Sequence, residues 1–240
     1  MLISVHVPKT AGTSFFQFLA KNFGGEILRD YGSETLEVSH LFESCFGEID
    51  AIKSTGYFRL KIIAEGLQRL RSEIDRRGIT AIHGHYRVDK YFGIFPNAKY
   101  AIWLREPFKR CLSQYFFHRR VLPGSANPVQ RAVHEHAMSF EDFISVEENI
   151  NLQYKMAGGD LRKFDFVGVT ERYEVGLQQF CSLFGLPRVA QMDIDRANVN
   201  PDSRIYDEYL TNDDIKQRFM RLNERDVELY DTALRASGGS

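Results

Sequence analysis

Several features that would assign this protein to a class at once are scarce in its sequence. The 240 residues contain only three cysteines, Cys45, Cys111 and Cys181, which lie far apart without metal-ligand spacing. An odd number of scattered cysteines favours free thiols in a reducing compartment over a disulfide framework. We therefore expect three free thiols and a cytoplasmic protein.

The sequence also lacks an excess of charge and a long hydrophobic run. Its 31 Lys and Arg residues balance 32 Asp and Glu residues, for a formal net charge of -1. Such a balance gives no broad field for nucleic acid or an anionic membrane, so any anion site must be local. The apolar run at residues 1–7 is far too short for a secretory or membrane segment. We expect neither nucleic acid nor a membrane as a partner, and the oligomeric state stays open.

What the sequence does contain is an alternation of strand-like and helix-like segments. A β-branched run at 3–7 precedes helical spacing at 14–21, and a buried-strand pattern at 99–104 precedes a helix at 107–120. Further strands are expected at 80–83 and 164–169, and further helices at 62–77, 140–146, 150–156, 171–184 and 212–236. Residues 121–136 have the composition of a surface loop.

This alternation predicts the fold class. Strands that alternate with helices favour a central, mostly parallel sheet flanked by helices, in which ligands bind beyond the carboxyl ends of the strands. We predict an α/β, P-loop-like three-layer fold that forms one domain over residues 1–240.

The sharpest motif is the loop that joins the first strand to the first helix. It reads Pro8-Lys9-Thr10-Ala11-Gly12-Thr13-Ser14. The free amides and dipole of a starting helix favour an oxyanion, and Lys9 adds a flexible positive charge. Ordinary helix capping by Thr13 or Ser14 is the alternative. The lysine precedes the glycine, unlike in a Walker A loop, which disfavours a metal-dependent phosphoryl transferase.

A second motif follows the strand at 99–104 and runs from Arg105 to Ser113. Arg105 can bind a phosphate through two parallel hydrogen bonds, and Ser113 can donate another. Because Arg105 precedes the helix that carries Ser113, the two meet only if the loop folds back. A surface ion pair between Arg105 and Glu106 is the alternative.

A third motif, His83-Gly84-His85, follows a predicted strand. Two side chains that are two residues apart on an extended segment point to the same side. Paired imidazoles also suggest a metal site, but no third ligand with matching spacing is visible. A structural pair without chemistry is the remaining alternative.

Together the three motifs resemble the sulfotransferase superfamily. Residues 8–14 correspond to its 5′-phosphosulfate loop, and Arg105 to Ser113 to its 3′-phosphate motif. The His-Gly-His element is similar to that of the branch with the heparan sulfate and dermatan sulfate uronyl 2-O-sulfotransferases. Landmarks at 149–153, 166–173 and 198–200 extend the resemblance over nearly the whole chain, although 167–171 can also be a buried strand with Thr170 as a helix cap.

The resemblance implies a donor and a set of residues that bind it. The donor is 3′-phosphoadenosine 5′-phosphosulfate, and no metal is required. The implied donor-binding residues are Lys9, Thr10, Ala11, Gly12, Thr13, Ser14, Arg105, Ser113, Asn198 and Asn200. The acceptor is a hydroxyl-bearing small molecule or glycan. Without a membrane anchor or paired cysteines, the Golgi setting and glycosaminoglycan acceptor of the eukaryotic members do not carry over.

The resemblance also implies a catalytic mechanism, in which the acceptor hydroxyl attacks sulfur in line. His85 is the predicted base, because an imidazole has a pKa near neutral pH, with His83 orienting it and Lys9 stabilising the developing charge. Two other classes stay open. A P-loop-type kinase would need an acidic magnesium ligand where Arg105 stands, and a nucleotide-binding regulator without catalysis would have no use for the two histidines.

Overall fold

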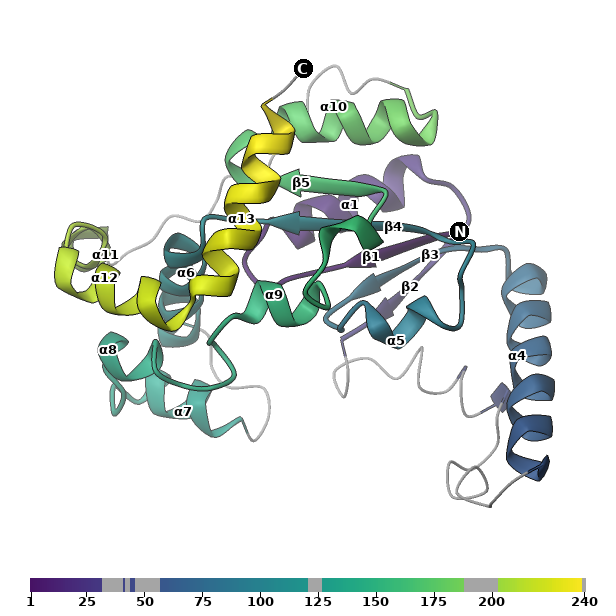
Figure 1. Ribbon diagram of the computed structural model, residues 1–240, viewed down its shortest axis with the longest axis horizontal. Coiled ribbons are helices and arrows are strands. Elements are labelled where there is room, and N and C mark those ends of the chain that lie inside the picture. Colours follow the sequence, from purple (N-terminus) through teal and green to yellow (C-terminus); the bar gives the residue numbers. More distant parts are fainter. Residues whose placement is uncertain (32–40, 42–43, 46–56, 121–126, 188–202, 239–240) are drawn as a thin grey trace.

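The computed structural model describes residues 1–31, 41, 44–45, 57–120, 127–187 and 203–238, and has a parallel sheet at its centre (Figure 1). Its strands are β1 (Leu2–Val5), β2 (Glu26–Asp30), β3 (Ile79–Gly84), β4 (Lys99–Leu104) and β5 (Phe166–Val169). They lie in the order β2-β3-β1-β4-β5, and every neighbouring pair is parallel. The predicted α/β class is confirmed, and the strands all end at one edge of the sheet.

Helices connect and surround these strands. The α-helices are α1 (Gly12–Asn22), α4 (Tyr57–Arg77), α5 (Asp89–Phe92), α6 (Pro107–Arg120), α7 (Pro128–His134), α8 (Phe140–Phe143), α9 (Leu152–Met156), α10 (Tyr173–Phe184), α11 (Ser203–Leu210), α12 (Asp213–Leu222) and α13 (Glu224–Ser237). Two short 3₁₀ helices, η2 (Leu161–Lys163) and η3 (Thr170–Arg172), flank β5.

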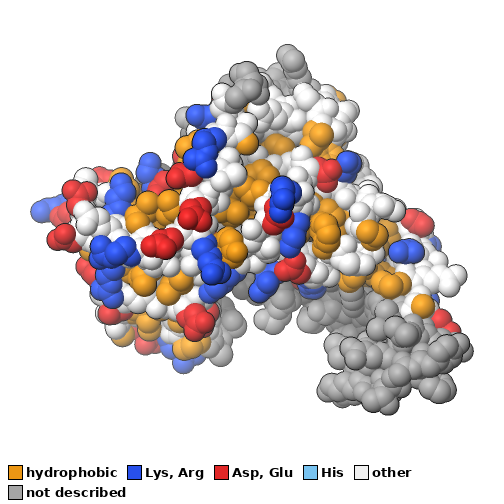
Figure 2. Space-filling view, in the orientation of Figure 1, with side chains coloured by type: hydrophobic (Ala, Val, Ile, Leu, Met, Phe, Trp, Pro, Cys, Tyr) orange, Lys and Arg blue, Asp and Glu red, His pale blue; other side chains and the backbone are white. Residues whose placement is uncertain are grey.

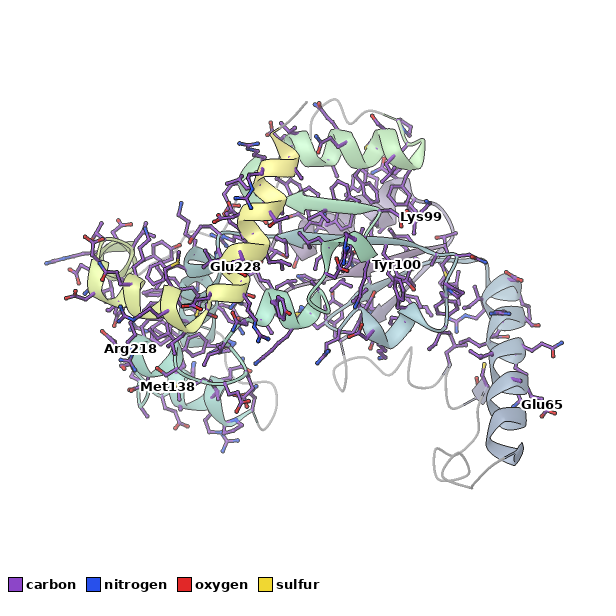
Figure 3. All side chains as sticks on the ribbon, in the orientation of Figure 1. Glu65, Lys99, Tyr100, Met138, Arg218 and Glu228 are labelled. Carbon is purple, nitrogen blue, oxygen red and sulfur yellow. The ribbon has the colours of Figure 1, made fainter. Side chains whose placement is uncertain are left out.

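The sheet separates two hydrophobic layers. On one face, Ile3, Val5 and Ile102 pack with residues of α4, α5, α9 and α13. On the other face, Leu2 and Trp103 pack with α1 and α10. Figure 1 shows α9 and α13 in front of the sheet and α1 behind it. In Figure 3, the labelled Tyr100 lies between the sheet and α5, where its hydroxyl donates to the carbonyls of Tyr91 and Phe95.

A third hydrophobic cluster lies beyond the carboxyl edge of the sheet. It joins α6, α7, α8, α11 and α12 through aromatic contacts, among them those of Phe108 with Phe140 and Phe219. These helices form the left part of the molecule in Figure 1. Because α6 begins directly after β4, this cluster borders the region where ligands bind in parallel α/β sheets.

The predicted and observed bounds agree best for the strand and helix that flank the Arg105 motif. The predicted strand 99–104 and helix 107–120 match β4 and α6 residue for residue. The prediction of a loop throughout 121–136 is wrong, because α7 lies within it. Pro128 occupies the start of α7, and the side chain of Asn127 accepts a hydrogen bond from the amide of Gln130. These are ordinary helix-start signals, but the prediction relied on the many turn-forming residues of the segment instead.

The surface carries mixed charge. Figure 2 shows Lys and Arg interspersed with Asp and Glu over the visible face, in agreement with the balanced composition. The three cysteines are free, as expected, and all three are buried. Within the described ranges, no helix has the length and apolar character needed to cross a membrane.

Candidate active site

The carboxyl edge of the sheet brings the predicted motifs together. Since all five strands are parallel, the residues that follow them meet at this edge. In sheet order these residues are Tyr31 after β2, His85 after β3, His6 after β1, Arg105 after β4 and Thr170 after β5. The loop at 8–14 leaves from the middle strand of this row.

The loop before α1 leaves the first amides of that helix available. Ala11 precedes the helix in a left-handed conformation with φ of 61°, Lys9 has φ of 71°, and no side chain caps the helix. The capping alternative for Thr13 and Ser14 is therefore wrong. Left-handed residues in such a loop turn backbone N–H groups into a concavity that suits an anion. Two non-glycine residues in this strained region indicate a functional loop.

Thr10 closes this loop from inside. Its side chain is fully buried, its hydroxyl donates to the carbonyl of Val7 over 2.8 Å, and its amide donates to the same oxygen over 3.3 Å. The Thr10 hydroxyl thus holds the turn, whereas Thr13 is exposed and Ser14 is half-buried at the helix start. The hydroxyls of Thr13 and Ser14 are the ones placed to meet a ligand.

Positive charge gathers around the loop. The Lys9 ammonium lies 4.4 Å from the centre of the Phe117 ring, and the Arg105 guanidinium donates to the Lys9 carbonyl over 3.2 Å. Burial, followed by the charges of Arg105 and Arg120, lowers the pKa of Lys9 to about 8. Like charges held together in a partly buried place raise the local positive potential. The arrangement suits a ligand with several negative charges.

The Arg105 guanidinium reaches the loop before α1, but Ser113 is not joined to it. No hydrogen bond joins the side chains of Arg105 and Ser113 in the described part of the chain, and Ser113 is half-buried on α6. The proposed Arg105–Glu106 surface pair is wrong. The Glu106 carboxylate instead accepts hydrogen bonds from the amides of Phe108 and Lys109, which caps α6.

The two histidines of the His-Gly-His motif have different surroundings. His83 is on β3 and is 1% exposed, with its Nδ1 2.8 Å from the Ser4 hydroxyl. Burial lowers the pKa of His83 to about 3. β3 ends at Gly84, and His85 is exposed. Protein around the His85 ring lowers its pKa to about 4, against the opposing effect of Asp30. Of the two histidines, only His85 is exposed.

Close packing against β2 requires a glycine at position 84, between the two histidines. A Cβ atom at this position would lie 1.8 Å from the backbone oxygen of Asp30. That oxygen also accepts the amide hydrogen of His85 over 2.8 Å. Glycine lets the ends of β2 and β3 approach, and this contact fixes where the His85 backbone leaves the sheet.

His6 is a site residue that the sequence analysis missed. Its ring stacks on His83 with centroids 5.0 Å apart, lies 4.5 Å from the His85 ring, and places Nδ1 3.1 Å from the Tyr31 hydroxyl. A Cβ on Gly12 would lie 1.9 Å from this ring, so glycine is required there. His6 thus contacts both the anion loop and the histidines. The predicted strand at 3–7 included His6, whereas β1 ends at Val5 and leaves His6 at the carboxyl edge of the sheet.

Asn198 and Asn200 lie outside the described residues. Thr170 does not cap a helix. Its hydroxyl donates to the Leu104 carbonyl over 2.9 Å, at the end of β4. Among the described residues, no group of three or more His, Cys, Asp or Glu side chains is arranged to hold a metal ion.

Comparison with known proteins identifies the family. The model of the sulfotransferase family matches residues 1–232. The chain belongs to the sulfotransferase family. Among solved structures, a sulfotransferase from Alicyclobacillus acidocaldarius is similar at 17% identity and a TM-score of 0.41, covering 96% of this chain and 98% of that chain. A search of curated proteins gave no match.

The buried His83 gives this sulfotransferase an expected acid sensitivity. The unfolded chain binds a proton at His83 below its ordinary pKa of 6.5, whereas the folded protein resists protonation until about pH 3. Stability is therefore lost as pH falls through this window. Between pH 7.5 and 4.5 we expect the free energy of unfolding to fall by about 2–3 kcal/mol more in the wild type than in His83→Gln.

Urea unfolding at the two pH values measures this difference. Carboxylates that titrate in the same range contribute equally to both proteins, so the difference reports on His83 together with its effect on the pKa of the neighbouring His6. Equal losses in wild type and variant would show that His83 is not held neutral by burial.

Proposed function

We propose that this sulfotransferase transfers a sulfuryl group from 3′-phosphoadenosine 5′-phosphosulfate to the hydroxyl of an acceptor. The observation that carries the proposal is the contact of Arg105 with Lys9 in the loop before α1, where the charge of Arg120 also acts on Lys9. The His6 ring packs between Gly12 of this loop and the ring of His85. The donor supplies an activated sulfuryl group and a nucleotide leaving group. Side chains and backbone amides at the carboxyl edge of the sheet would bind the donor, stabilise the developing charge and remove the acceptor proton.

The residues present fit such a donor. The uncapped amides at the start of α1 and the Lys9 ammonium are suited to the 5′-phosphosulfate, because helix-end amides and a nearby cation bind oxyanions. The Arg105 guanidinium, on the neighbouring strand end, is suited to the 3′-phosphate, with Ser113 as a further donor on α6. Asn198 and Asn200 remain assigned by family resemblance alone.

His85 is the proposed base. Of the two histidines of the motif, His85 is the exposed residue. Desolvation lowers its pKa to about 4, which leaves the imidazole neutral and ready to accept a proton at pH 7 but makes it a weaker base than an ordinary imidazole. His83 holds the position behind it through Ser4, and His6 packs against both rings. The acceptor is proposed to be a hydroxyl-bearing small molecule or glycan, and the reaction is proposed to run in the cytoplasm without a metal cofactor.

Binding of the product nucleotide without metal tests the proposal. We expect calorimetry to show that 3′-phosphoadenosine 5′-phosphate binds in the presence of EDTA with an affinity that added magnesium changes by less than about twofold. The physical reason is that Lys9, Arg105, Arg120 and the α1 amides supply the positive potential.

Two outcomes would contradict this expectation. Binding that requires magnesium would favour a kinase-like site. Binding without sulfuryl transfer to any acceptor in a broad panel would favour a nucleotide-binding regulator.

A further inference from the structure

The backbone that follows β4 is held by side chains from two other segments. The Arg105 amide donates to Gln153 Oε1 over 3.0 Å, and the Arg105 carbonyl accepts from Gln153 Nε2 over 2.9 Å. One residue earlier, the Leu104 carbonyl accepts from Thr170, and one residue later, the Glu106 amide donates to Glu171. The two peptide groups on either side of Arg105 are therefore fixed by hydrogen bonds at both their N–H and their C=O.

Gln153 is itself rigidly placed. It is fully buried, so its amide makes these two bonds away from competing water. Its own backbone amide donates to the Asp226 carboxylate over 3.3 Å, and the next amide, that of Tyr154, donates over 2.7 Å. Asp226 is on α13, which also carries Tyr230, whose hydroxyl donates to Glu171 over 3.1 Å. The carboxy-terminal helix thus supports both contacts that hold the Arg105 backbone.

This arrangement has a direct consequence for the anion site. The Arg105 guanidinium extends from the fixed backbone to the Lys9 carbonyl in the loop before α1. Charged groups that bind a ligand must be held within a fraction of an ångström, which side chains achieve only on a supported backbone. A strand end without such support would let the guanidinium move relative to the loop.

We propose that Gln153 is a positioning residue that sets the affinity of the Arg105 site for the 3′-phosphate. The inference rests on the proposed function, in which Arg105 binds that phosphate. Gln153 touches no ligand. It acts through the backbone of Arg105, which gives a role to the glutamine of the stretch 149–153.

A pair of nucleotides tests the proposal. 3′-Phosphoadenosine 5′-phosphate and adenosine 5′-monophosphate differ only in the 3′-phosphate, so the ratio of their dissociation constants reports on the Arg105 site. In Gln153→Glu, the side chain keeps its shape, and in its ionised form it cannot donate to the Arg105 carbonyl. In Gln153→Met, it cannot make either bond. We expect each variant to lower the ratio about tenfold, as loss of a supporting hydrogen bond does at metal sites, and to leave monophosphate binding within twofold.

Controls separate positioning from loss of folding. Gln178→Glu makes the same change on the exposed surface of α10 and should leave the ratio unchanged. Retained monophosphate binding and an unchanged circular dichroism spectrum show that each Gln153 variant is folded. In an Arg105→Ala background, Gln153→Met should lower the ratio no further, because both residues act on one interaction.

The possible failures are distinguishable. If Arg105→Ala leaves the nucleotide ratio unchanged, the 3′-phosphate assignment and the proposed function fail together. If Arg105→Ala lowers the ratio and folded Gln153 variants do not, the positioning role alone is overturned. Equal weakening of both nucleotides by the Gln153 variants would likewise overturn it, in favour of a general structural role.

Discussion

Replacing His85 with alanine is expected to lower turnover by roughly 10²- to 10⁴-fold, the usual contribution of a positioned general base. Affinity for 3′-phosphoadenosine 5′-phosphate should stay within about twofold, because the base acts on the acceptor proton. The exposed place of the ring makes chemical rescue possible, so added imidazole should restore part of the activity of His85→Ala. Steady-state kinetics and calorimetry on the same preparation measure both quantities.

The pH dependence provides a second readout of His85. A base works when neutral, and the pKa of His85 is lowered to about 4. Activity should therefore persist as pH falls past 6.5 and decline only as it approaches about 4, provided that the protein stays folded. His83→Gln is the matched comparison, because His83 is buried and bonded to Ser4. Loss of turnover in that variant, with full activity in His85→Ala, would show that His83 is the base and His85 the supporting residue.

Replacing Lys9 with methionine is expected to lower turnover by on the order of 10²- to 10³-fold, the cost of removing one preorganised donor to developing charge. Methionine keeps an unbranched apolar chain that can pack on Phe117, so the change removes mainly the charge. Arginine should not restore activity, because its planar fork differs from a compact ammonium.

Lys109→Met provides the control for Lys9→Met. Lys109 is an exposed lysine on α6, and its backbone amide donates a hydrogen bond to the Glu106 carboxylate. The same loss of charge there should leave single-turnover rates unchanged. Comparable rates in Lys9→Met and wild type would remove Lys9 from the chemistry and leave the α1 amides as the site for the transferring group.

The structure changes what the motifs mean for catalysis. The sequence predicted that His83 and His85 form a pair on one face of an extended segment. In the structure β3 ends at Gly84, between the two residues, and His83 is buried whereas His85 is exposed. The third imidazole, His6, presses on Gly12 at the start of α1. The His6 ring therefore connects the anion loop with the proposed base, and a change at His6 would disturb both.

The sequence by itself determined the parts of this protein that depend on local order. The run Tyr100–Leu104 is apolar and contains two aromatic residues and a β-branched one, and Pro107 suits the first turn of a helix, so β4 and α6 could be placed to the residue. The loop at 8–14 and Arg105 were likewise visible, because a strand, a polar loop and a helix follow one another in the chain. Both motifs are short, and their chemistry depends on residue type.

Tertiary structure alone decided which distant residues meet and which are buried. The strand β2 has Glu26, Arg29 and Asp30 among its five residues and carries no clear strand signal, yet its end positions Tyr31 beside His6 and His85. Gln153 is 48 residues from Arg105, and no local pattern connects them. The physical reason is that parallel pairing joins strand ends across long crossovers, and the burial that shifts a pKa or fixes a hydrogen bond comes from neighbours remote in the chain.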